Sequence, residues 1–359
     1  MSPTETTNQA PRALPRVRGA VVLIALLAAV AAVRGCVAPS QPLRLVGTSM
    51  GTTWSVVVAG DGPFSGDEAR ELRRVVEEEL ARVDDAMSTW RPETAVSRFN
   101  AAEPGVGVEL GEATWEVLDV SRRAHDATGG AFDPTVGPLV KAWGFGGGAK
   151  GEAPDADELR RLHGLVGFEH LVDRRPVLDK DVAGVEIDFS AVAKGFAVDR
   201  VSDALVAAGA TNHLVEVGGE VRVRGERPGG GAWRVGVEDP SHPEGGRAAE
   251  VLALSERALA TSGDYRNARE VDGELVSHLF DPRVLRPIAT HVASASVVAP
   301  TCARADALAT ALAVLGSDGI RLLEDQGDVE AMIYLRREDG GFDREATSGF
   351  DAFVEAAGH

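Results

Sequence analysis

The chain has 359 residues, of which 44% are hydrophobic and 26% are charged, and its formal net charge is −18. This length and composition are typical of a globular protein with one large or two medium domains. The acidic balance argues against a nucleic-acid partner, because binding to phosphates requires a basic surface.

The amino-terminal segment has the pattern of an export signal. Arg12, Arg16 and Arg18 precede an uncharged apolar run at residues 19–33. This order matches the basic and apolar regions of a secretory signal peptide. The run is short for a membrane span, and an uncleaved membrane anchor stays open as the alternative.

Cys36 follows this run closely, in a setting that resembles the cleavage and lipidation site of bacterial lipoproteins. Arg34 stands where such sites usually have a small or apolar residue. The only other cysteine, Cys302, lies among small apolar residues, so we expect it to pack in the core. No intrachain disulfide is expected once Cys36 carries a lipid.

These features predict the domain organisation. We assign residues 1–36 to a signal peptide or membrane anchor, residues 37–42 to a short linker and residues 43–359 to one folded domain.

The first clear helix follows a strand expected at residues 52–59. Ser65 and Glu68 form a capping box, and apolar residues then recur at helical spacing as far as Met87. The loop after this helix contains Trp90. An aromatic side chain in a loop either covers the core or offers a platform for a planar ligand.

A second helix, expected at residues 112–128, should stop at Gly129 and Gly130. Glycine, proline and aromatic residues are then frequent over residues 129–148, which indicates a rigid loop whose backbone can approach a ligand closely. The glycines at 144–148 have neither a strand before them nor a helix after them. Rossmann and Walker phosphate loops are therefore excluded.

The centre of the predicted site is the stretch at residues 185–200. Alternating apolar residues at 185–189 indicate a strand that turns into a helix near Ser190. Unpaired N–H groups at the start of a helix can bind an anion, and Asp188 and Lys194 lie on either side of this start. Lysine is rare in the chain, which favours a specific role for Lys194, although a partly exposed lysine on a helix surface is the alternative.

Strands and helices continue to alternate along the rest of the chain, but without a regular βαβ order. This irregular order favours an α+β fold over a doubly wound sheet. The expected strands are at 214–217, 221–225, 233–237, 250–254, 292–298 and 331–335, and the expected helices are at 303–315 and 320–325.

Two further pairs of residues suggest chemistry. His278 precedes Asp281 at a strand end, where an acid can orient an imidazole as a base, although a lone histidine is usually structural. Asp306 and Thr310 are four residues apart and share one face of a helix.

If that face is buried, Asp306 needs a partner or a metal, because an unpaired buried charge is costly. A carboxylate and a hydroxyl suit Mg²⁺, with water and substrate phosphate as its other ligands. Alternatively, the hydroxyl of Thr310 bonds back to its own helix.

The order of these patches closely resembles the FAD:protein FMN transferases, the ApbE family, over residues 43–335. The segments that carry the resemblance are residues 50–52, 87–92, 97–100, 129–138, 188–200, 217–219, 278–282 and 305–312. The resemblance implies a single α+β catalytic domain. It also implies Mg²⁺-dependent transfer of the FMN half of FAD to a threonine or serine hydroxyl of a partner protein, with AMP leaving.

The resemblance further implies roles for single residues. Asp306, Thr310 and the backbone carbonyl of Ala191 match metal-binding positions, and Lys194 matches a lysine near the pyrophosphate of FAD. The other positions that match FAD contacts are Met50, Ala131, Phe132, Asp133, Asp188 and Leu279.

In the same resemblance, Trp90 stands where tyrosine is more usual, and we expect it to stack on the adenine ring. His278 matches the base that takes the proton of the acceptor hydroxyl, and we expect Asp281 to orient it. Val284 and Leu285 replace the Thr-Gly pair that usually follows this segment.

Together with the resemblance, the amino-terminal segment leads us to expect an exported protein, tethered on the periplasmic side of the bacterial inner membrane by that segment or by a lipid on Cys36. The resemblance also implies that the acceptor protein is an electron-transfer subunit of the membrane or periplasm. Two alternatives stay open: a Mg²⁺-dependent FAD pyrophosphatase, in which water is the nucleophile, and a non-catalytic flavin-binding lipoprotein.

Overall fold

The computed structural model describes residues 41–145, 153–242, 246–263, 269–271, 274–288 and 291–355. The expected signal or anchor segment and Cys36 lie outside the described residues. The residues from Gln41 to His359 form one compact unit. Among the described residues, no helix is both long and apolar enough to cross a lipid bilayer.

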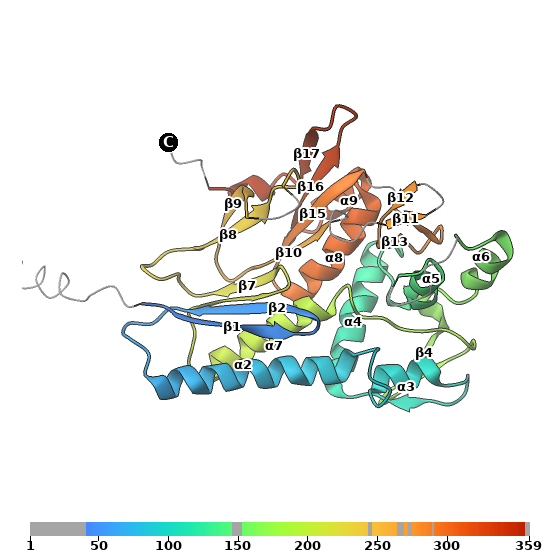
Figure 1. The fold of residues 1–359 in the computed structure, drawn as a ribbon, viewed down its shortest axis with the longest axis horizontal. Coiled ribbons are helices and arrows are strands. Elements are labelled where there is room, and N and C mark those ends of the chain that lie inside the picture. Colours follow the sequence, from blue (N-terminus) through green and yellow to red (C-terminus); the bar gives the residue numbers. More distant parts are fainter. Residues whose placement is uncertain are drawn as a thin grey trace, which may run out of the picture. The chain divides into compact units, whose positions relative to one another are not determined.

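An antiparallel sheet of eight strands forms the centre of this unit (Figure 1). The expected strand at 52–59 belongs to it, but its first and last strands were not expected from the sequence. In spatial order the strands are β1 (Leu43–Ser49), β2 (Thr52–Val58), β6 (His213–Val217), β7 (Glu220–Arg224), β10 (Ala258–Gly263), β15 (Val292–Ala299), β16 (Glu330–Arg336) and β17 (Phe342–Ala346).

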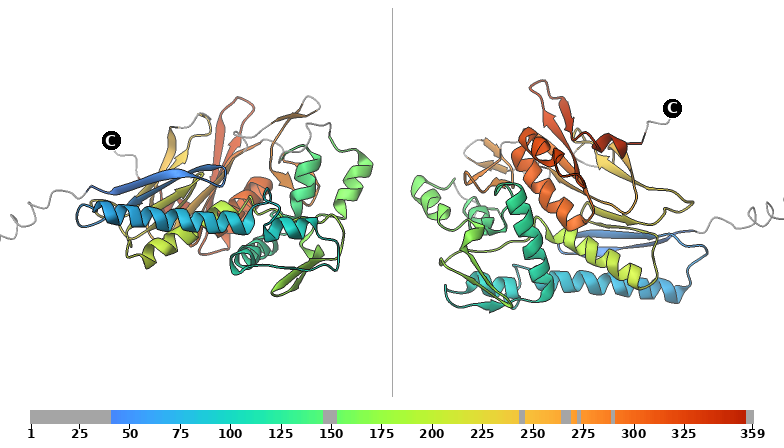
Figure 2. Two further views of the ribbon diagram at one scale, coloured as in Figure 1. Left: turned by 60° about the horizontal axis from the view of Figure 1, so that its bottom comes forward. Right: turned by 180° about the vertical axis from the view of Figure 1, so that it is seen from behind.

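Two helices, α7 (Ala193–Ala207) and α8 (Cys302–Leu315), lie side by side against this sheet. Figure 2 shows them from two directions, together with α2 (Gly66–Met87), which packs on α7, and α4 (Glu112–Ala127), which contacts α8. The predicted capping box of α2 is confirmed. Helix α9 (Ser317–Glu324) follows α8 and contacts β16.

The opposite face of the sheet is covered by a hairpin of β8 (Trp233–Glu238) and β9 (Ala248–Leu254). Along β10 the side chains alternate between the two cores: Leu259 packs with the hairpin, whereas Ala260 packs toward α8. This alternation follows from the two-residue period of a strand.

Smaller elements lie together at one end of the unit in Figure 1. They are α3 (Ala95–Ala101), α5 (Gly137–Ala142), α6 (Ala156–His163) and a three-stranded sheet of β3 (Val108–Glu109), β5 (Val177–Lys180) and β4 (Leu171–Arg174). The short pairs are β11 (Arg269–Val271) with β12 (Glu274–Val276) and β13 (Phe280–Asp281) with β14 (Arg286–Pro287); the 3₁₀ turns are η1 (Pro134–Val136), η2 (Phe168–His170) and η3 (Phe350–Ala352).

The prediction of a strand at 185–189 is wrong, and α7 begins at Ala193 instead of near Ser190. The segment is extended, but its backbone forms hydrogen bonds with side chains instead of with a neighbouring strand. Asn100 donates from Nδ2 to the carbonyl of Ile187 at 2.9 Å and accepts from its N–H at 2.8 Å. The ammonium of Lys180 donates to the carbonyl of Val185 at 2.7 Å. Apolar alternation alone cannot distinguish these two arrangements.

The mixture of helices and antiparallel sheets confirms the predicted α+β class. The glycine- and proline-rich loop is partly helical, because η1 and α5 form within it. Proline is favoured in the first turn of a helix, where its missing N–H is not needed.

Candidate functional site

Two tight turns of the central sheet meet the start of α7. Met50 and Gly51, both with positive φ, connect β1 to β2, and Gly218 and Gly219 connect β6 to β7. A Cβ on Gly218 would lie 2.9 Å from Cγ2 of Thr52 and 3.1 Å from Cδ of Lys194. Glycine is therefore required at position 218, both for its φ of +61° and for this close approach.

Lys194 lies in the first turn of α7 and reaches the sheet. Its Nζ is 2.5 Å from Oε1 of Glu220, the first residue of β7, whose side chain is only 3% exposed. Lys194 is therefore partly exposed, with 31% of its side chain accessible, but its ammonium pairs with a buried acid.

Helix α8 approaches α7 closely at Gly195. A Cβ at this position would lie 2.4 Å from the carbonyl oxygen of Cys302, so a larger residue would push the two helices apart. The short separation lets the N–H of Gly195 donate to Oδ2 of Asp306 at 2.9 Å. Cys302 is fully buried, which fits the packing role expected from the sequence.

The three charged residues at this junction influence one another. Burial and the nearby charge of Asp306 raise the pKa of Glu220, against the opposing effect of Lys194, with which Glu220 forms an ion pair. Burial likewise raises the pKa of Asp306. Although burial alone would lower it, the pKa of Lys194 is raised by the charges of Asp306 and Glu220. Two acids thus share one lysine, and an additional positive charge would be favoured here.

Thr310 lies one turn beyond Asp306 on α8, as its spacing predicted. Its hydroxyl is 3.3 Å from that of Ser262 on β10. The alternative, a hydrogen bond back to its own helix, is not present among the described residues. Ala191 is partly buried in the turn just before α7.

This set of oxygen atoms fits a hard cation. Only one of the two oxygens of Asp306 accepts a hydrogen bond within the described part of the chain, which leaves the other available. The described residues contain no cluster of three or more His, Cys, Asp or Glu side chains that could hold a metal by themselves. A cation held by Asp306, Thr310 and a backbone carbonyl would need water and phosphate as further ligands, which is how Mg²⁺ is usually bound.

His278 is close enough to this cluster to be influenced by it. Burial, and secondarily the positive charge of Lys194, lower the pKa of His278. Its Nδ1 atom is buried and has no hydrogen-bond partner in the part of the chain that the structure describes. The imidazole is therefore neutral at physiological pH, as a base requires.

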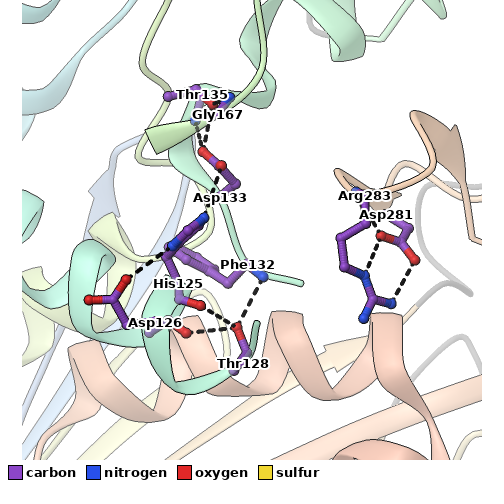
Figure 3. Close-up of polar contacts among 10 residues, drawn as sticks. His125, Asp126, Thr128, Phe132, Asp133, Thr135, Gly167, Asp281 and Arg283 are labelled. Atoms are coloured by element: carbon purple, nitrogen blue, oxygen red, sulfur yellow. Dashed lines mark hydrogen bonds and ion pairs between the residues drawn. The ribbon is translucent and has the colours of Figure 1, made fainter. Parts of the chain in front are cut away.

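The expectation that Asp281 orients His278 is not met in the structure. The carboxylate of Asp281 pairs with the guanidinium of Arg283 through two hydrogen bonds of 2.8 Å (Figure 3). It also accepts from the Arg283 N–H at 2.9 Å. A local partner two residues away occupies the acid, because the short β13–β14 hairpin turns the two side chains together. Leu279, which the resemblance places among the FAD contacts, packs against the core beneath α8.

Asp133 has its carboxylate engaged within its own loop (Figure 3). Oδ1 accepts from the N–H and hydroxyl of Thr135, at 2.7 and 2.6 Å, and Oδ2 lies 3.5 Å from Nε2 of His125. The hydroxyl of Thr135 in turn accepts from the N–H of Gly167 at 2.7 Å. Ala131 and Phe132 are buried in the main core, so their side chains serve packing.

Asp188 forms a local turn, accepting from the N–H of Ser190 at 2.8 Å and also from its hydroxyl. Its own N–H donates to the carbonyl of Pro134 at 2.7 Å. This bond joins the glycine- and proline-rich loop to the segment before α7.

Trp90 lies in the loop after α2 and is 75% exposed, so it does not cover the core. Its ring is available to a ligand. No contact within the described part of the chain joins it to Lys194, Asp306 or His278.

The structure thus brings together Lys194, Asp306 and Thr310, with the Met50 turn and His278 nearby. Sequence reasoning missed Glu220. The strands expected at 214–217 and 221–225 leave Gly218 and Gly219 as the turn between them, but a single acid beside such a turn is typical of the protein surface. The signal that could have revealed Glu220 is its position directly after a turn of two glycines, which places it opposite Val217.

A sequence profile of the ApbE family matches residues 50–333. The FAD:protein FMN transferase of Vibrio cholerae is 35% identical over 329 residues, which cover 91% of this chain and 97% of the relative. That of Haemophilus influenzae is 33% identical over 342 residues, covering 93% and 97%. The apo crystal structure of the Pseudomonas stutzeri flavinyl transferase ApbE matches with a TM-score of 0.79 and 34% identity, covering 88% of this chain and 98% of that one. The chain therefore belongs to the ApbE family.

Proposed function

We propose that this protein is an FAD:protein FMN transferase that moves the FMN half of FAD to a threonine or serine hydroxyl of an acceptor protein in a Mg²⁺-dependent reaction. The observation that carries the proposal is the cluster of Lys194 with the buried acids Glu220 and Asp306, with Thr310 and a neutral His278 beside it. The names of the curated relatives agree with it.

In this reaction the acceptor oxygen forms a bond to the phosphorus of the FMN phosphate, the bond from that phosphorus to the oxygen shared with AMP breaks, and AMP leaves. Transfer of this kind depends mainly on positioning the reactants and on neutralising phosphate charge. Lys194 provides a fixed positive charge for the diphosphate. His278 takes the proton of the acceptor hydroxyl.

Asp306, Thr310 and the carbonyl of Ala191 are the residues that would hold Mg²⁺. Bound there, the cation would supply further neutralisation of the diphosphate. The excess of acidic groups at the α7–α8 junction supports this assignment, because a site with two acids and one lysine attracts positive charge.

The site of action that we propose is the periplasmic side of the bacterial inner membrane. The basic residues and the apolar run before residue 34 support export, and Cys36 supports a lipid tether. The acceptor would be an electron-transfer subunit of the membrane or periplasm.

Incubation of the purified protein with FAD, Mg²⁺ and a candidate acceptor tests the proposal. Mass spectrometry of the acceptor should show one added FMN, and chelation of Mg²⁺ should prevent it. Free FMN without a covalent adduct would point to hydrolysis instead. Unchanged FAD would point to storage of the flavin.

A further inference from the structure

Glu220 is a buried carboxylate to which the proposed reaction assigns no role. It follows the Gly218–Gly219 turn directly, and its side chain is 3% exposed. Oε1 contacts Nζ of Lys194, but Oε2 is buried without any hydrogen-bond partner among the described residues. Burying a carboxylate oxygen without a partner is costly, so such a group in a folded protein requires an explanation.

The ion pair restricts Lys194 at the end of its side chain, and the glycine turn restricts it along its stem. A Cβ on Gly218 would lie 3.1 Å from Cδ of Lys194, so the backbone of the turn is in close contact with this part of the side chain. A free lysine side chain is flexible, and ordering it costs entropy. Here that ordering has already taken place in the folded protein, before any ligand binds.

Stability does not explain this arrangement. Glu220 lies near a second buried acid, Asp306, and the two carboxylates share one lysine. Replacing buried ion pairs by apolar residues often leaves stability unchanged or raises it. Groups that are retained at such a cost are concentrated at functional sites.

We propose that Glu220 is a positioning residue, which holds the ammonium of Lys194 in the orientation that meets the diphosphate of FAD. The inference rests on the proposed function, because it takes Lys194 as the contact to the diphosphate. Glu220 acts through Lys194, and its effect on FAD therefore depends on the presence of that lysine.

Glu220→Gln keeps the shape of the side chain and removes the charge that holds Lys194. The dissociation constant for FAD, measured by flavin fluorescence in the presence of Mg²⁺, should rise about 10- to 100-fold, as expected for a misplaced binding group. The melting temperature should equal or exceed that of the wild type, since a buried charge beside Asp306 is removed. An FAD affinity equal to that of the wild type would overturn the proposal.

A double-mutant cycle with Lys194→Met separates positioning from a general structural effect. In the Lys194→Met background, Glu220→Gln should change FAD affinity by less than about 2-fold, because the group on which Glu220 acts is absent. Effects that multiply in the double variant would show that the two residues act independently. That result would contradict the proposal.

Glu216→Gln is the matched control. Glu216 lies on the other strand of the same hairpin, accepts from the hydroxyl of Ser55 at 3.0 Å and from the N–H of Gly219 at 2.9 Å, and does not contact Lys194. Its FAD affinity should stay within about 2-fold of the wild type. A loss as large as that of Glu220→Gln would assign the effect to the hairpin and overturn the proposal.

The FAD-binding measurement does not depend on transfer. A wild-type protein that binds FAD but leaves every acceptor unmodified would contradict the proposed function, while the cycle would still decide the role of Glu220. If the wild type transfers FMN but the effects of Glu220→Gln and Lys194→Met on FAD affinity are independent, only the proposed role of Glu220 would be contradicted. A wild type that does not bind FAD would overturn both.

Discussion

Asp133 and Asp306 are both buried, at 6% and 3% exposure, yet their surroundings differ. Asp133 accepts two short hydrogen bonds from Thr135 and faces His125, so the loop that contains it satisfies its charge locally. Asp306 accepts one hydrogen bond, from Gly195, and shares the charge of Lys194 with a second acid. Burial raises the pKa of both acids.

The comparison separates a carboxylate that shapes the fold from one that is available to a ligand. A buried acid with its own donors stabilises the loop around it. A buried acid with too few donors and too little positive charge gains most when a cation and a phosphate arrive. The loss on mutation should therefore appear in stability for Asp133 and in activity for Asp306.

The largest effect should come from Asp306→Ala. We expect FMN transfer to fall about 1,000-fold or more, because removing a group that stabilises charge in the reaction has effects of this size. The protein should stay folded, as judged by circular dichroism and thermal unfolding. Asp318→Ala, at an exposed position on α9, is the control and should be fully active. Full activity of Asp306→Ala would remove the metal assignment.

His278→Gln should lower the transfer rate by about 100-fold or more at neutral pH, as expected for loss of a general base. The pH profile gives a sharper test. Because the pKa of His278 is lowered from 6.5, more than half of the wild-type imidazole is still neutral at pH 6.5, and the rate there should exceed half of its maximum. The rate should fall below half only at lower pH, and this decline should be absent in His278→Gln. A wild-type rate already halved above pH 6.5 would exclude His278 as the base.

Asp133→Ala should act mainly on stability. We expect the free energy of unfolding, measured in urea, to fall by about 1–3 kcal/mol, because the N–H and hydroxyl of Thr135 lose their acceptor. Asp133→Asn keeps an acceptor oxygen and should lose less. The resemblance to the family places Asp133 among the FAD contacts. If Asp133→Ala lowers the affinity for FAD while the free energy of unfolding is retained, the FAD contact would be supported. The distinction between Asp133 and Asp306 would then be wrong.

The smallest effect should come from Trp90→Ala. The side chain is 75% exposed, so the free energy of unfolding should change by less than about 0.5 kcal/mol. If the ring stacks on adenine, FAD affinity should fall about 3- to 10-fold. Trp90→Tyr should restore most of it. Unchanged FAD affinity in Trp90→Ala would show that the indole does not contact the nucleotide.

Much of the fold could be predicted because its signals are local. The capping box of α2, the period of its apolar residues and the glycine turn between β6 and β7 all depend on residues close in sequence. The edge strands β1 and β17 were missed, since few of their side chains are buried and such strands carry a weak apolar alternation. The extended segment at 185–189 was taken for a strand because the side chain of Asn100, far away in sequence, completes its hydrogen bonds.

The sequence by itself determined that Asp306 and Thr310 share one face of a helix, because their separation of four residues fixes that geometry within α8. It also placed Lys194 near the start of α7. Only the tertiary structure decided that Glu220 pairs with Lys194 and that Asp281 turns to Arg283. The pairing of Glu220 depends on how α7 packs against β7, which residue spacing does not determine, because packing between elements is set by the whole core. Asp281 has a partner only two residues away, but the sequence offered it both His278 and Arg283, and the fold of the short hairpin selects Arg283.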